Sequence, residues 1–149
     1  MNPTQIGILV PDLAEGIAAW TTLVGGDEWA VYSFTPESFR ESRYRGEPGR
    51  FSLRAAFHGT APQIELIEPR DGPSIYHEWI ERHGYGLHHL GIHVPAGTGD
   101  PPGLEPVQMG SGFGLDGDGR FAYYDRTSDL GVWIELIEPA ARRRPPESL

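Results

Sequence analysis

Two glutamates, Glu65 and Glu135, occupy the same place in two identical stretches of the chain. The hexapeptide Ile-Glu-Leu-Ile-Glu-Pro occurs at residues 64–69 and again at 134–139. Each copy alternates like a β-strand that ends at proline. In such a strand the first glutamate points away from the face that its isoleucine and leucine neighbours bury. A carboxylate held in this way can bind a cation or transfer a proton, so both positions are candidates for a functional site.

A second pair of related strands supports an internal duplication. The stretch Gln-Ile-Gly-Ile-Leu-Val-Pro at 5–11 resembles His-Leu-Gly-Ile-His-Val-Pro at 89–95. Repetition of this kind indicates two copies of one supersecondary unit. Each of these strands begins with a polar side chain that can act as a ligand. The predicted functional centre consists of the four polar residues at matching places: Gln5, Glu65, His89 and Glu135.

The elements around these strands predict an α+β fold. In the first module Asp12 and Glu15 have the spacing of a helix N-cap, and Gly25-Gly26 ends the helix. The corresponding segment of the second module, 96–106, carries four glycines or prolines in its first half, which an ordinary helix does not tolerate. We therefore expect two βαβββ-type modules, with the helix of the second module shortened or absent.

The segment between the modules is typical of a short helix. Ser74 can cap this helix and Gly84 can end it. Residues 35–50 are charged and interrupted by glycine and proline, which predicts a loop that covers the site as a lid. The predicted organisation is one domain at 1–140, made of module one at 1–70, a connector helix at 71–86 and module two at 87–140, followed by a disordered tail at 141–149.

Composition narrows the classes of function. The chain of 149 residues has no cysteine, a formal charge of −9, 20 glycines and 14 prolines. These values favour many turns and short strands, exclude disulfides and thiolate metal sites, and disfavour nucleic acid as a partner. No stretch is long and apolar enough to cross a membrane. We expect a cytoplasmic domain that acts on a small molecule and does not contact a membrane.

Two such modules, each with a ligand on its first and last strands, resemble the vicinal oxygen chelate superfamily. This superfamily includes glyoxalase I, methylmalonyl-CoA epimerase, extradiol dioxygenases and antibiotic-binding resistance proteins. The resemblance is carried by the strings QIGILVPDL and GLHHLGIHV and by the two IELIEP strands. It implies that the modules curl into a half-barrel around a divalent metal. By this resemblance the protein ligands are Gln5, Glu65, His89 and Glu135, and two coordination positions are left for water or substrate.

Physical chemistry supports the metal independently. Four inward polar side chains on strands otherwise lined by isoleucine, leucine and valine would be costly to bury unpaired. A divalent cation would satisfy two carboxylates, one imidazole and one amide oxygen together. This donor set suits Zn, Ni, Co, Mn or Fe and does not separate them. The competing interpretation is that these residues are solvated polar groups on an open sheet.

The ligand types and the flanking sequence resemble different members of the superfamily. The order Gln, Glu, His, Glu is similar to glyoxalase I of the eukaryotic type, and it differs from the two-histidine iron site of the dioxygenases. The run GPSIYHEWIERHGYGLHHLGIHV at 72–94 resembles methylmalonyl-CoA epimerase. The epimerases use a further carboxylate on the third strand, whereas residues 51–57 of this chain contain no acid.

Both relatives share one chemistry, in which a metal stabilises the enediolate formed when a proton beside a carbonyl is removed. The predicted base is Glu135, which would leave the metal, with Glu65 as its counterpart in the other module. Strand alternation places His93 on the same face as His89, and His88 on the opposite face. The candidates for substrate binding are Arg54, His93, Tyr123 and Arg120.

The expected function is that of a divalent-metal-dependent isomerase or epimerase for a small carbonyl or thioester compound, similar to methylmalonyl-CoA epimerase. A glyoxalase I-type lactoylglutathione lyase is the alternative among enzymes. A metal-free antibiotic-binding resistance protein is the alternative outside them, since such proteins are acidic dimers that trap a cationic drug. A homodimer is expected because two modules expose sheet edges.

Overall fold

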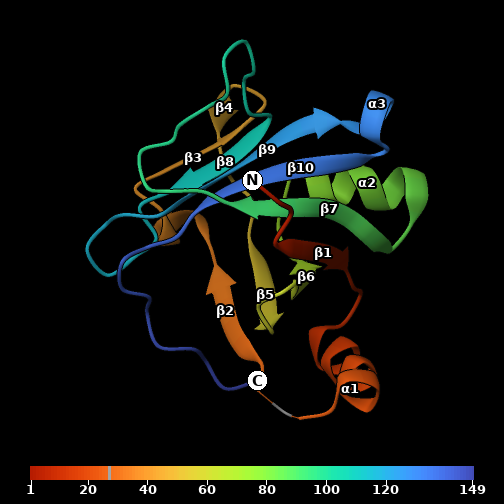
Figure 1. Cartoon of the computed structure of the whole chain (residues 1–149). Helices are drawn as coiled ribbons and strands as arrows, with labels where there is room; N and C mark the ends of the chain where they lie inside the picture. The colour runs from red at the N-terminus through yellow and green to blue at the C-terminus, as the bar shows by residue number, and fades with distance from the viewer. Residues whose placement is uncertain (27) are drawn as a thin grey trace.

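The strands form one curled sheet that encloses the site (Figure 1). The structure is a computed structural model that describes residues 1–26 and 28–149. The order of strands across the sheet is β2-β5-β6-β1-β7-β10-β9-β8-β3-β4. In chain order the elements are β1 (Gln5–Leu9), α1 (Leu13–Val24), β2 (Ala30–Phe34), the 3-10 turn η1 (Pro36–Ser38), β3 (Glu41–Tyr44), β4 (Glu47–Pro48), β5 (Leu53–His58), β6 (Gln63–Pro69), α2 (Ile75–His83), β7 (Gly86–His93), β8 (Gln108–Ser111), β9 (Arg120–Arg126), α3 (Thr127–Leu130) and β10 (Val132–Glu138).

The two halves of the sheet repeat one another and meet at its centre. β1 pairs in parallel with β6, and β10 pairs in parallel with β7. An antiparallel pairing of β1 with β7 joins the halves. The four strands that carry the predicted ligands are therefore neighbours, in the order β6-β1-β7-β10. This arrangement confirms the predicted α+β half-barrel built from two related modules.

Helix α1 packs against the first half of the sheet. It begins as predicted, because the Asp12 carboxylate accepts a hydrogen bond from the Glu15 amide at 2.8 Å. Leu13 is buried in one cluster with Val10 and Leu66. A helix of 12 residues is marginal alone in water, so burial of this apolar side stabilises it.

The connector and the second module also follow the expected pattern of helices. α2 begins after Ser74, whose hydroxyl accepts a hydrogen bond from the His77 amide, and ends at Gly84. Between β7 and β8, in a region that the structure describes completely, residues 94–107 contain no helix. Among the described residues, no helix combines the length and the apolar character needed to span a membrane.

Residues 35–50 do not form the predicted loop over the site. They contain β3 and β4, a hairpin whose two-residue turn consists of Arg45 (φ 50°) and Gly46 (φ 81°). Positive φ at both turn positions matches the twist of a tight hairpin. β3 also pairs with β8, so a segment of module one forms the sheet edge of module two. The strand is too polar to show an apolar alternation, which is why its sequence predicts a loop.

The last residues run back past β2 (Figure 1). The segment 141–149, predicted to be a disordered tail, bonds to the rest of the chain at both ends. The Ala141 amide donates to the Asp118 carboxylate at 2.8 Å, and the Glu147 amide donates to the Val31 carbonyl at 2.8 Å. These partners lie far away in the sequence, so no local pattern of residues indicates the contacts.

Candidate metal centre

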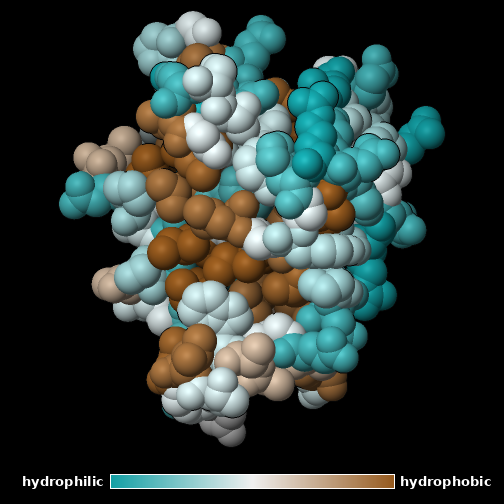
Figure 2. Space-filling view, turned by 90° about the vertical axis from the view of Figure 1, so that its right-hand side faces the viewer, coloured by the Kyte–Doolittle hydropathy of each residue, from teal (hydrophilic) through white to brown (hydrophobic). Residues whose placement is uncertain are grey.

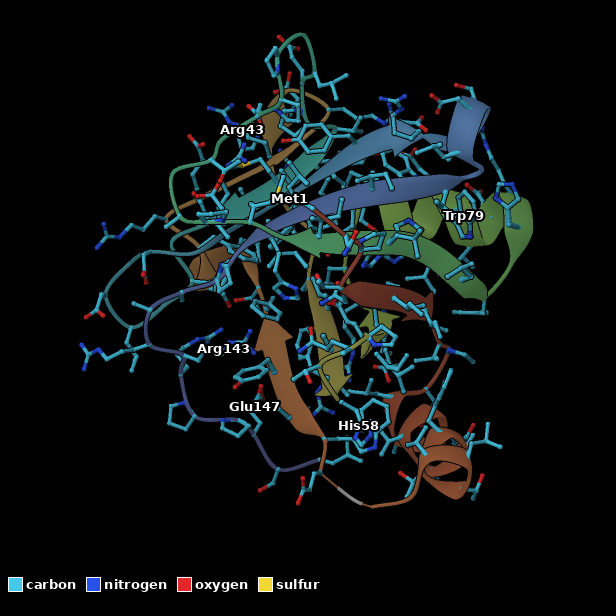
Figure 3. All side chains as sticks on the ribbon, in the orientation of Figure 1. Met1, Arg43, His58, Trp79, Arg143 and Glu147 are labelled. Atoms are coloured by element: carbon cyan, nitrogen blue, oxygen red, sulfur yellow. The ribbon has the colours of Figure 1, made fainter. Side chains whose placement is uncertain are left out.

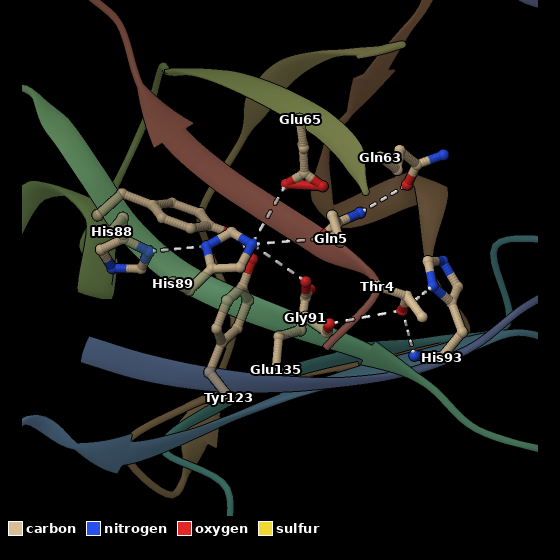
Figure 4. Close-up of polar contacts among 11 residues, drawn as sticks. Thr4, Gln5, Gln63, Glu65, His88, His89, Gly91, His93, Tyr123 and Glu135 are labelled. Carbon is tan, nitrogen blue, oxygen red and sulfur yellow. Dashed lines mark hydrogen bonds and ion pairs between the residues drawn. The ribbon is translucent and has the colours of Figure 1, made fainter. Parts of the chain in front are cut away.

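Four polar side chains from the four central strands meet at one point inside the half-barrel (Figure 4). The Nε2 atom of His89 lies 3.2 Å from a Glu135 carboxylate oxygen, 3.8 Å from a Glu65 carboxylate oxygen and 3.3 Å from the Gln5 amide oxygen. One ligand atom from each of the two glutamates and the histidine lies within 4.8 Å of the others. All four side chains are buried. The structure thus brings the whole predicted quartet together.

Two glycines give these side chains their space. Gly7 lies opposite His89 in the sheet, and a Cβ atom at Gly7 would stand 1.9 Å from the imidazole Cε1. Gly91 lies opposite Gln5, and a Cβ atom at Gly91 would stand 2.8 Å from the amide oxygen. Neither glycine belongs to the set of site residues predicted from the sequence. The sequence does contain one indication of their role, because each glycine is the third residue of its stretch in the related pair 5–11 and 89–95.

A β-bulge in β7 turns two consecutive histidines toward each other. Gly7 pairs with His89 and the next residue, Ile8, pairs with Leu87, which leaves His88 as the extra residue. His88 is fully buried, and its Nδ1 lies 3.0 Å from Nδ1 of His89. The prediction that His88 lies on the opposite face from His89 is therefore wrong, because strict alternation fails at a bulge.

The contact between the two histidines defines the ligand atom. Burial lowers the pKa of His88 well below its ordinary value, so this imidazole is neutral at physiological pH. Its Nδ1 can accept the hydrogen of His89 Nδ1. That hydrogen bond leaves Nε2 of His89 with its lone pair facing the carboxylates, as a metal ligand requires.

A neighbouring glutamine orients the fourth ligand. Gln5 Nε2 donates a hydrogen bond to Gln63 Oε1 at 2.9 Å. The amide oxygen of Gln5 then points toward the imidazole of His89. Gln63 lies on β6, two residues before Glu65, so one strand supplies a carboxylate and also positions the amide.

The charge balance of the cluster fits a divalent cation. Burial raises the pKa of Glu65 well above its ordinary value, and the negative charge of Glu135 raises it further. One carboxylate oxygen of Glu135 is buried and has no hydrogen-bond partner within the described part of the chain. A divalent ion would neutralise both carboxylates and satisfy this oxygen. The four residues therefore fit such an ion as a ligand set.

A cavity of about 90 Å³ lies against the cluster. Its apolar and aromatic wall comes from both halves of the sheet and is formed by Tyr32, Phe34, Leu53, Ala55, Phe57, Tyr76, Phe113, Phe121, Tyr123 and Ile137. The polar and charged side chains in the wall are Gln5, Gln63, Glu65, His93, Glu135, Arg143 and Arg144. A concave, mostly apolar site with a few convergent polar groups suits the reacting part of a small molecule.

Two of the residues predicted to bind substrate line this cavity. The imidazole Nδ1 of His93 lies 2.6 Å from the Thr4 hydroxyl, which fixes the ring. The Tyr76 hydroxyl donates to the Tyr123 hydroxyl at 2.9 Å, which leaves the proton of Tyr123 free for another acceptor. Burial raises the pKa of Tyr123 well above its ordinary value. Tyr123 is thus a neutral hydrogen-bond donor in the cavity wall.

The structure does not bring the two predicted arginines, Arg54 and Arg120, to the cavity. Leu53 and Ala55 of β5 line the wall, and strand alternation turns the residue between them, Arg54, to the other face. Arg120 instead forms an ion pair with Asp100 at 2.6 Å.

Two other arginines, Arg143 and Arg144, line the cavity, although sequence analysis placed them in a disordered tail. The sequence around them offers only three arginines followed by two prolines. Such a pattern is common in solvated segments, so it does not by itself indicate a site.

The sequence matches the profile of one known protein superfamily. A profile of the Glyoxalase/Bleomycin resistance protein/Dioxygenase superfamily matches residues 4–98, which is more than half of the 149 residues. The chain therefore belongs to this superfamily. The matched segment contains three members of the quartet, and Glu135 lies beyond it. A search of curated proteins gives no match.

Solved structures with a similar fold include methylmalonyl-CoA epimerases. A variant of the Streptomyces coelicolor enzyme in complex with 2-nitronate-propionyl-CoA has a TM-score of 0.58 at 19% identity, over 97% of this chain and 99% of that chain. The Mycobacterium tuberculosis enzyme has a TM-score of 0.53 at 21% identity, over 91% and 86%. A hypothetical protein from Bacillus halodurans C-125 has a TM-score of 0.55 at 19% identity, over 96% and 97%. At such identities the likeness shows the fold.

Proposed function

We propose that this protein is a divalent-metal-dependent isomerase or epimerase that moves a proton beside the carbonyl of a small compound or thioester. The observation that carries the proposal is the buried cluster of two carboxylates, one imidazole and one amide oxygen beside a small aromatic cavity. When bound, a divalent ion supplies a Lewis acid that polarises the carbonyl and makes the neighbouring proton more acidic. Its ligands would be Gln5, Glu65, His89 and Glu135.

In this proposal the two carboxylates handle a proton on either side of the substrate. Glu65 comes from β6 and Glu135 comes from β10, the outer pair of the four central strands. We assign Glu135 as the base that removes the proton and Glu65 as the acid that returns one. Removal on one side and return on the other inverts the carbon centre, which is an epimerisation. Return by the same carboxylate to a neighbouring atom would give an isomerisation.

Tyr123 is suited to stabilise the negative charge that develops on the substrate oxygen. Its hydroxyl is neutral, buried and already accepts a hydrogen bond from Tyr76, so its own proton is available. A preorganised donor in a site shielded from water stabilises such charge more than water would. His93, fixed by Thr4, presents a second polar group to the same cavity.

Acyl-CoA thioesters are the first substrates to test because the solved structures with a similar fold include methylmalonyl-CoA epimerases. The cavity-facing side chains of β5 are Leu53, Ala55 and Phe57. This strand therefore supplies no further carboxylate to the site. In this chain proton transfer would fall to the two glutamates of the metal cluster alone.

A glyoxalase I-type lyase is the second candidate. The observation that favours it is the donor set, which contains two glutamates, one histidine and one glutamine. Its substrate would be a hemithioacetal of glutathione, and the same carboxylates would move the proton between neighbouring carbons. Comparing turnover of acyl-CoA epimers and hemithioacetals by one preparation separates the two candidates.

The first experiment is metal content per chain, measured by mass spectrometry on wild type and His89→Ala. We expect near-stoichiometric transition metal in the wild type and little in the variant. Exchange of the substrate proton for deuterium, followed by NMR, then reports enolisation. Glu135→Gln should keep the fold and lose at least about 100-fold of this exchange. A wild type that takes up no metal yet binds a cationic drug tightly would favour the antibiotic-binding alternative instead.

We also propose that the protein forms a homodimer. Apolar side chains gather across the centre of one face of the molecule (Figure 2). Among the large apolar side chains, Leu23 and Leu87 are exposed by 80% and 50%. An exposed apolar area of this kind is typical of an interaction surface. Light scattering coupled to size exclusion should give twice the chain mass of 16.5 kDa. A mass of one chain at micromolar concentration would contradict the dimer.

A further inference from the structure

We propose that Arg143, carried by the C-terminal segment, is a specificity-determining residue that binds a carboxylate group on the substrate. The inference rests on the proposed function, and it narrows the substrate class to small carbonyl compounds that bear a carboxylate. Three observations support the role of Arg143: the C-terminal segment is anchored on both sides of it, its positive charge lies at the cavity, and much of the remaining cavity wall is apolar.

The C-terminal segment is fastened on both sides of Arg143. On one side the Arg142 carbonyl accepts from the Leu115 amide at 3.0 Å, and the Arg142 guanidinium is ion-paired with Asp116. On the other side Glu147 bonds through its amide to the Val31 carbonyl and through its carboxylate to Ser33. Residues 143–146 therefore form a strap between the β8–β9 connection and β2. Pro145 and Pro146 restrict the backbone of this strap.

The strap crosses between two distant parts of the sheet. β2 is the outermost strand of the first half, whereas β8 and β9 belong to the second half. A connection between them passes over the open side of the half-barrel, and in Figure 3 Arg143 and Glu147 lie along this segment beside β2. The cavity wall accordingly contains residues of the sheet and of the strap.

Arg143 brings a positive charge that the described residues do not neutralise. No carboxylate of the described chain lies within ion-pair distance of its guanidinium, whereas Arg45, Arg120 and Arg142 each have an acidic partner. Its charge reaches into the cavity. Burial lowers the pKa of His93 against the opposing effect of Glu135, and the charge of Arg143 lowers this pKa further. Arg143 is thus a free donor at the edge of the site.

The neighbouring arginine has a different role in the strap. The guanidinium carbon of Arg144 lies 5.7 Å from the centre of the Phe34 ring. Such a cation–π contact fixes the arginine against β2 and helps to hold the strap in place. This contact leaves Arg143 as the better candidate for a direct bond to substrate.

The charge of the loaded site favours an anion. A divalent ion offsets the two negative charges of Glu65 and Glu135, so the arginines of the strap remain as the excess positive charge around the cavity. Apart from Gln5, Gln63 and His93, the rest of the wall is aromatic and aliphatic. An arginine fork matches the two oxygens of a carboxylate. The site therefore selects a compact substrate with a carboxylate and rejects a cationic ligand.

The test measures binding of malonate and of its neutral analogue malonamide to the metal-loaded protein by calorimetry. Arg143→Gln should weaken malonate binding by about 10- to 100-fold and leave malonamide binding and metal content unchanged. Arg143→Lys should recover part of the malonate affinity, because it restores the charge but not the fork. The matched control is Arg126→Gln, which removes an arginine that pairs with Asp129 outside the cavity.

The outcomes separate this inference from the proposed function. Equal malonate affinity of wild type and Arg143→Gln, with stoichiometric metal in both, overturns the role of Arg143 and leaves the metal site standing. A wild type without metal overturns the proposed function and, with it, the excess positive charge inferred for the metal-loaded cavity. A third outcome is that the wild type binds inorganic phosphate but not malonate, and that Arg143→Gln loses the phosphate binding. This result would overturn the proposal that Arg143 binds a carboxylate and would assign it to a phosphate group.

Discussion

Gly7 and Gly91 belong to the proposed site as much as the ligands do. Each lies opposite a ligand across the β1–β7 pairing, and each leaves the volume that the ligand side chain fills. The two glycines stand at equal positions in the two related strands, so both modules of the duplicated unit provide the same clearance. His89 and Gln5 need this clearance, because a Cβ atom at Gly7 or Gly91 would occupy the space of the imidazole or of the amide.

Gly7→Ala should weaken metal binding at least about 10-fold, because its Cβ would stand 1.9 Å from His89 Cε1 and force the imidazole out of the cluster. Overpacking should also lower the free energy of unfolding by about 1 to 3 kcal/mol. Metal titration and urea denaturation measure the two effects. In the control Gly16→Ala the nearest atom would be Val10 Cγ1 at 3.3 Å, far from the cluster. Unchanged metal affinity in Gly7→Ala would contradict the assigned role.

His88 acts on the site through His89. Its ring is enclosed by Tyr76, Trp79 and Trp133, and its contact with the Nδ1 of His89 is the one that sets the tautomer of that ligand. His88→Phe would keep the aromatic packing and remove the acceptor. We expect about 10-fold weaker metal binding with little change in stability.

Metal titration of His88→Phe beside His83→Ala tests this positioning role. His83 is an exposed histidine on α2, so its loss should leave metal affinity unchanged. Full metal affinity in His88→Phe would show that the tautomer of His89 does not depend on its neighbour.

At the scale of elements, the β3–β4 hairpin is held by α2 as well as by β8. Arg45, in the turn between β3 and β4, donates to the Glu78 carboxylate of α2 with its Nε at 2.9 Å, and the Tyr44 hydroxyl donates to the same carboxylate. The hydrogen bond from Arg45 lowers the pKa of Glu78 below its ordinary value. A segment from module one is thereby fastened to the connector helix.

Glu78→Gln should lower the free energy of unfolding by about 0.5 to 1 kcal/mol at pH 7, a modest value because solvent partly screens the pair. The sign follows from the lowered pKa. The carboxylate stabilises the folded state above the ordinary pKa of 4.5, and this contribution is lost as the pH falls through the lowered folded-state pKa. Urea denaturation should therefore separate wild type from variant at pH 7, and the difference should become smaller as the pH is lowered.

The exposed Glu81 of the same helix provides the control for Glu78. Glu81→Gln should match the wild type at both pH values. An equal loss in both variants, or a loss in Glu78→Gln that does not become smaller as the pH is lowered, would mean that the ion pair with Arg45 is not its source.

At this scale, features that depend on residues close together in the sequence could be predicted, whereas features that depend on the pairing of distant strands could not. The quartet could be predicted because the two related pairs of strands can be aligned with each other, and this alignment puts the four polar residues at matching positions. The inward position of His88 depends on a bulge, and a bulge is a property of two paired strands rather than of one. The strand 41–44 is polar and pairs with a segment more than sixty residues away. By contrast, the sequence does indicate that Arg54 points away from the cavity, because it alternates with the apolar residues Leu53 and Ala55 along one strand.

At the scale of the whole molecule, three features connect the two halves of the chain. The β1–β7 pairing joins them at the centre, β3 crosses from the first module to the edge of the second, and the strap returns from the second module to β2. The proposed metal would add a fourth link, since its ligands come from both modules. The β3 crossing and the strap involve residues that no local pattern brings together, so their contacts could not be predicted from the sequence.

Because its ligands come from both halves, the metal should stabilise the whole domain rather than a single loop. An ion that binds only the folded state at 100 times its dissociation constant adds about 2.7 kcal/mol. In a domain of this size that corresponds to a rise in Tm of about 5 to 10 °C. Calorimetry before and after chelation, and after the ion is restored, measures the shift.

His89→Ala provides the control for this experiment, since its Tm should be the same with and without the ion. The comparison is made within each protein, so a general loss of stability in the variant does not affect it. A wild type whose Tm changes neither on chelation nor on addition of metal would contradict the proposal that the ion links the two halves. A shift in wild type that persists in His89→Ala would place the ion elsewhere on this acidic chain, outside the half-barrel.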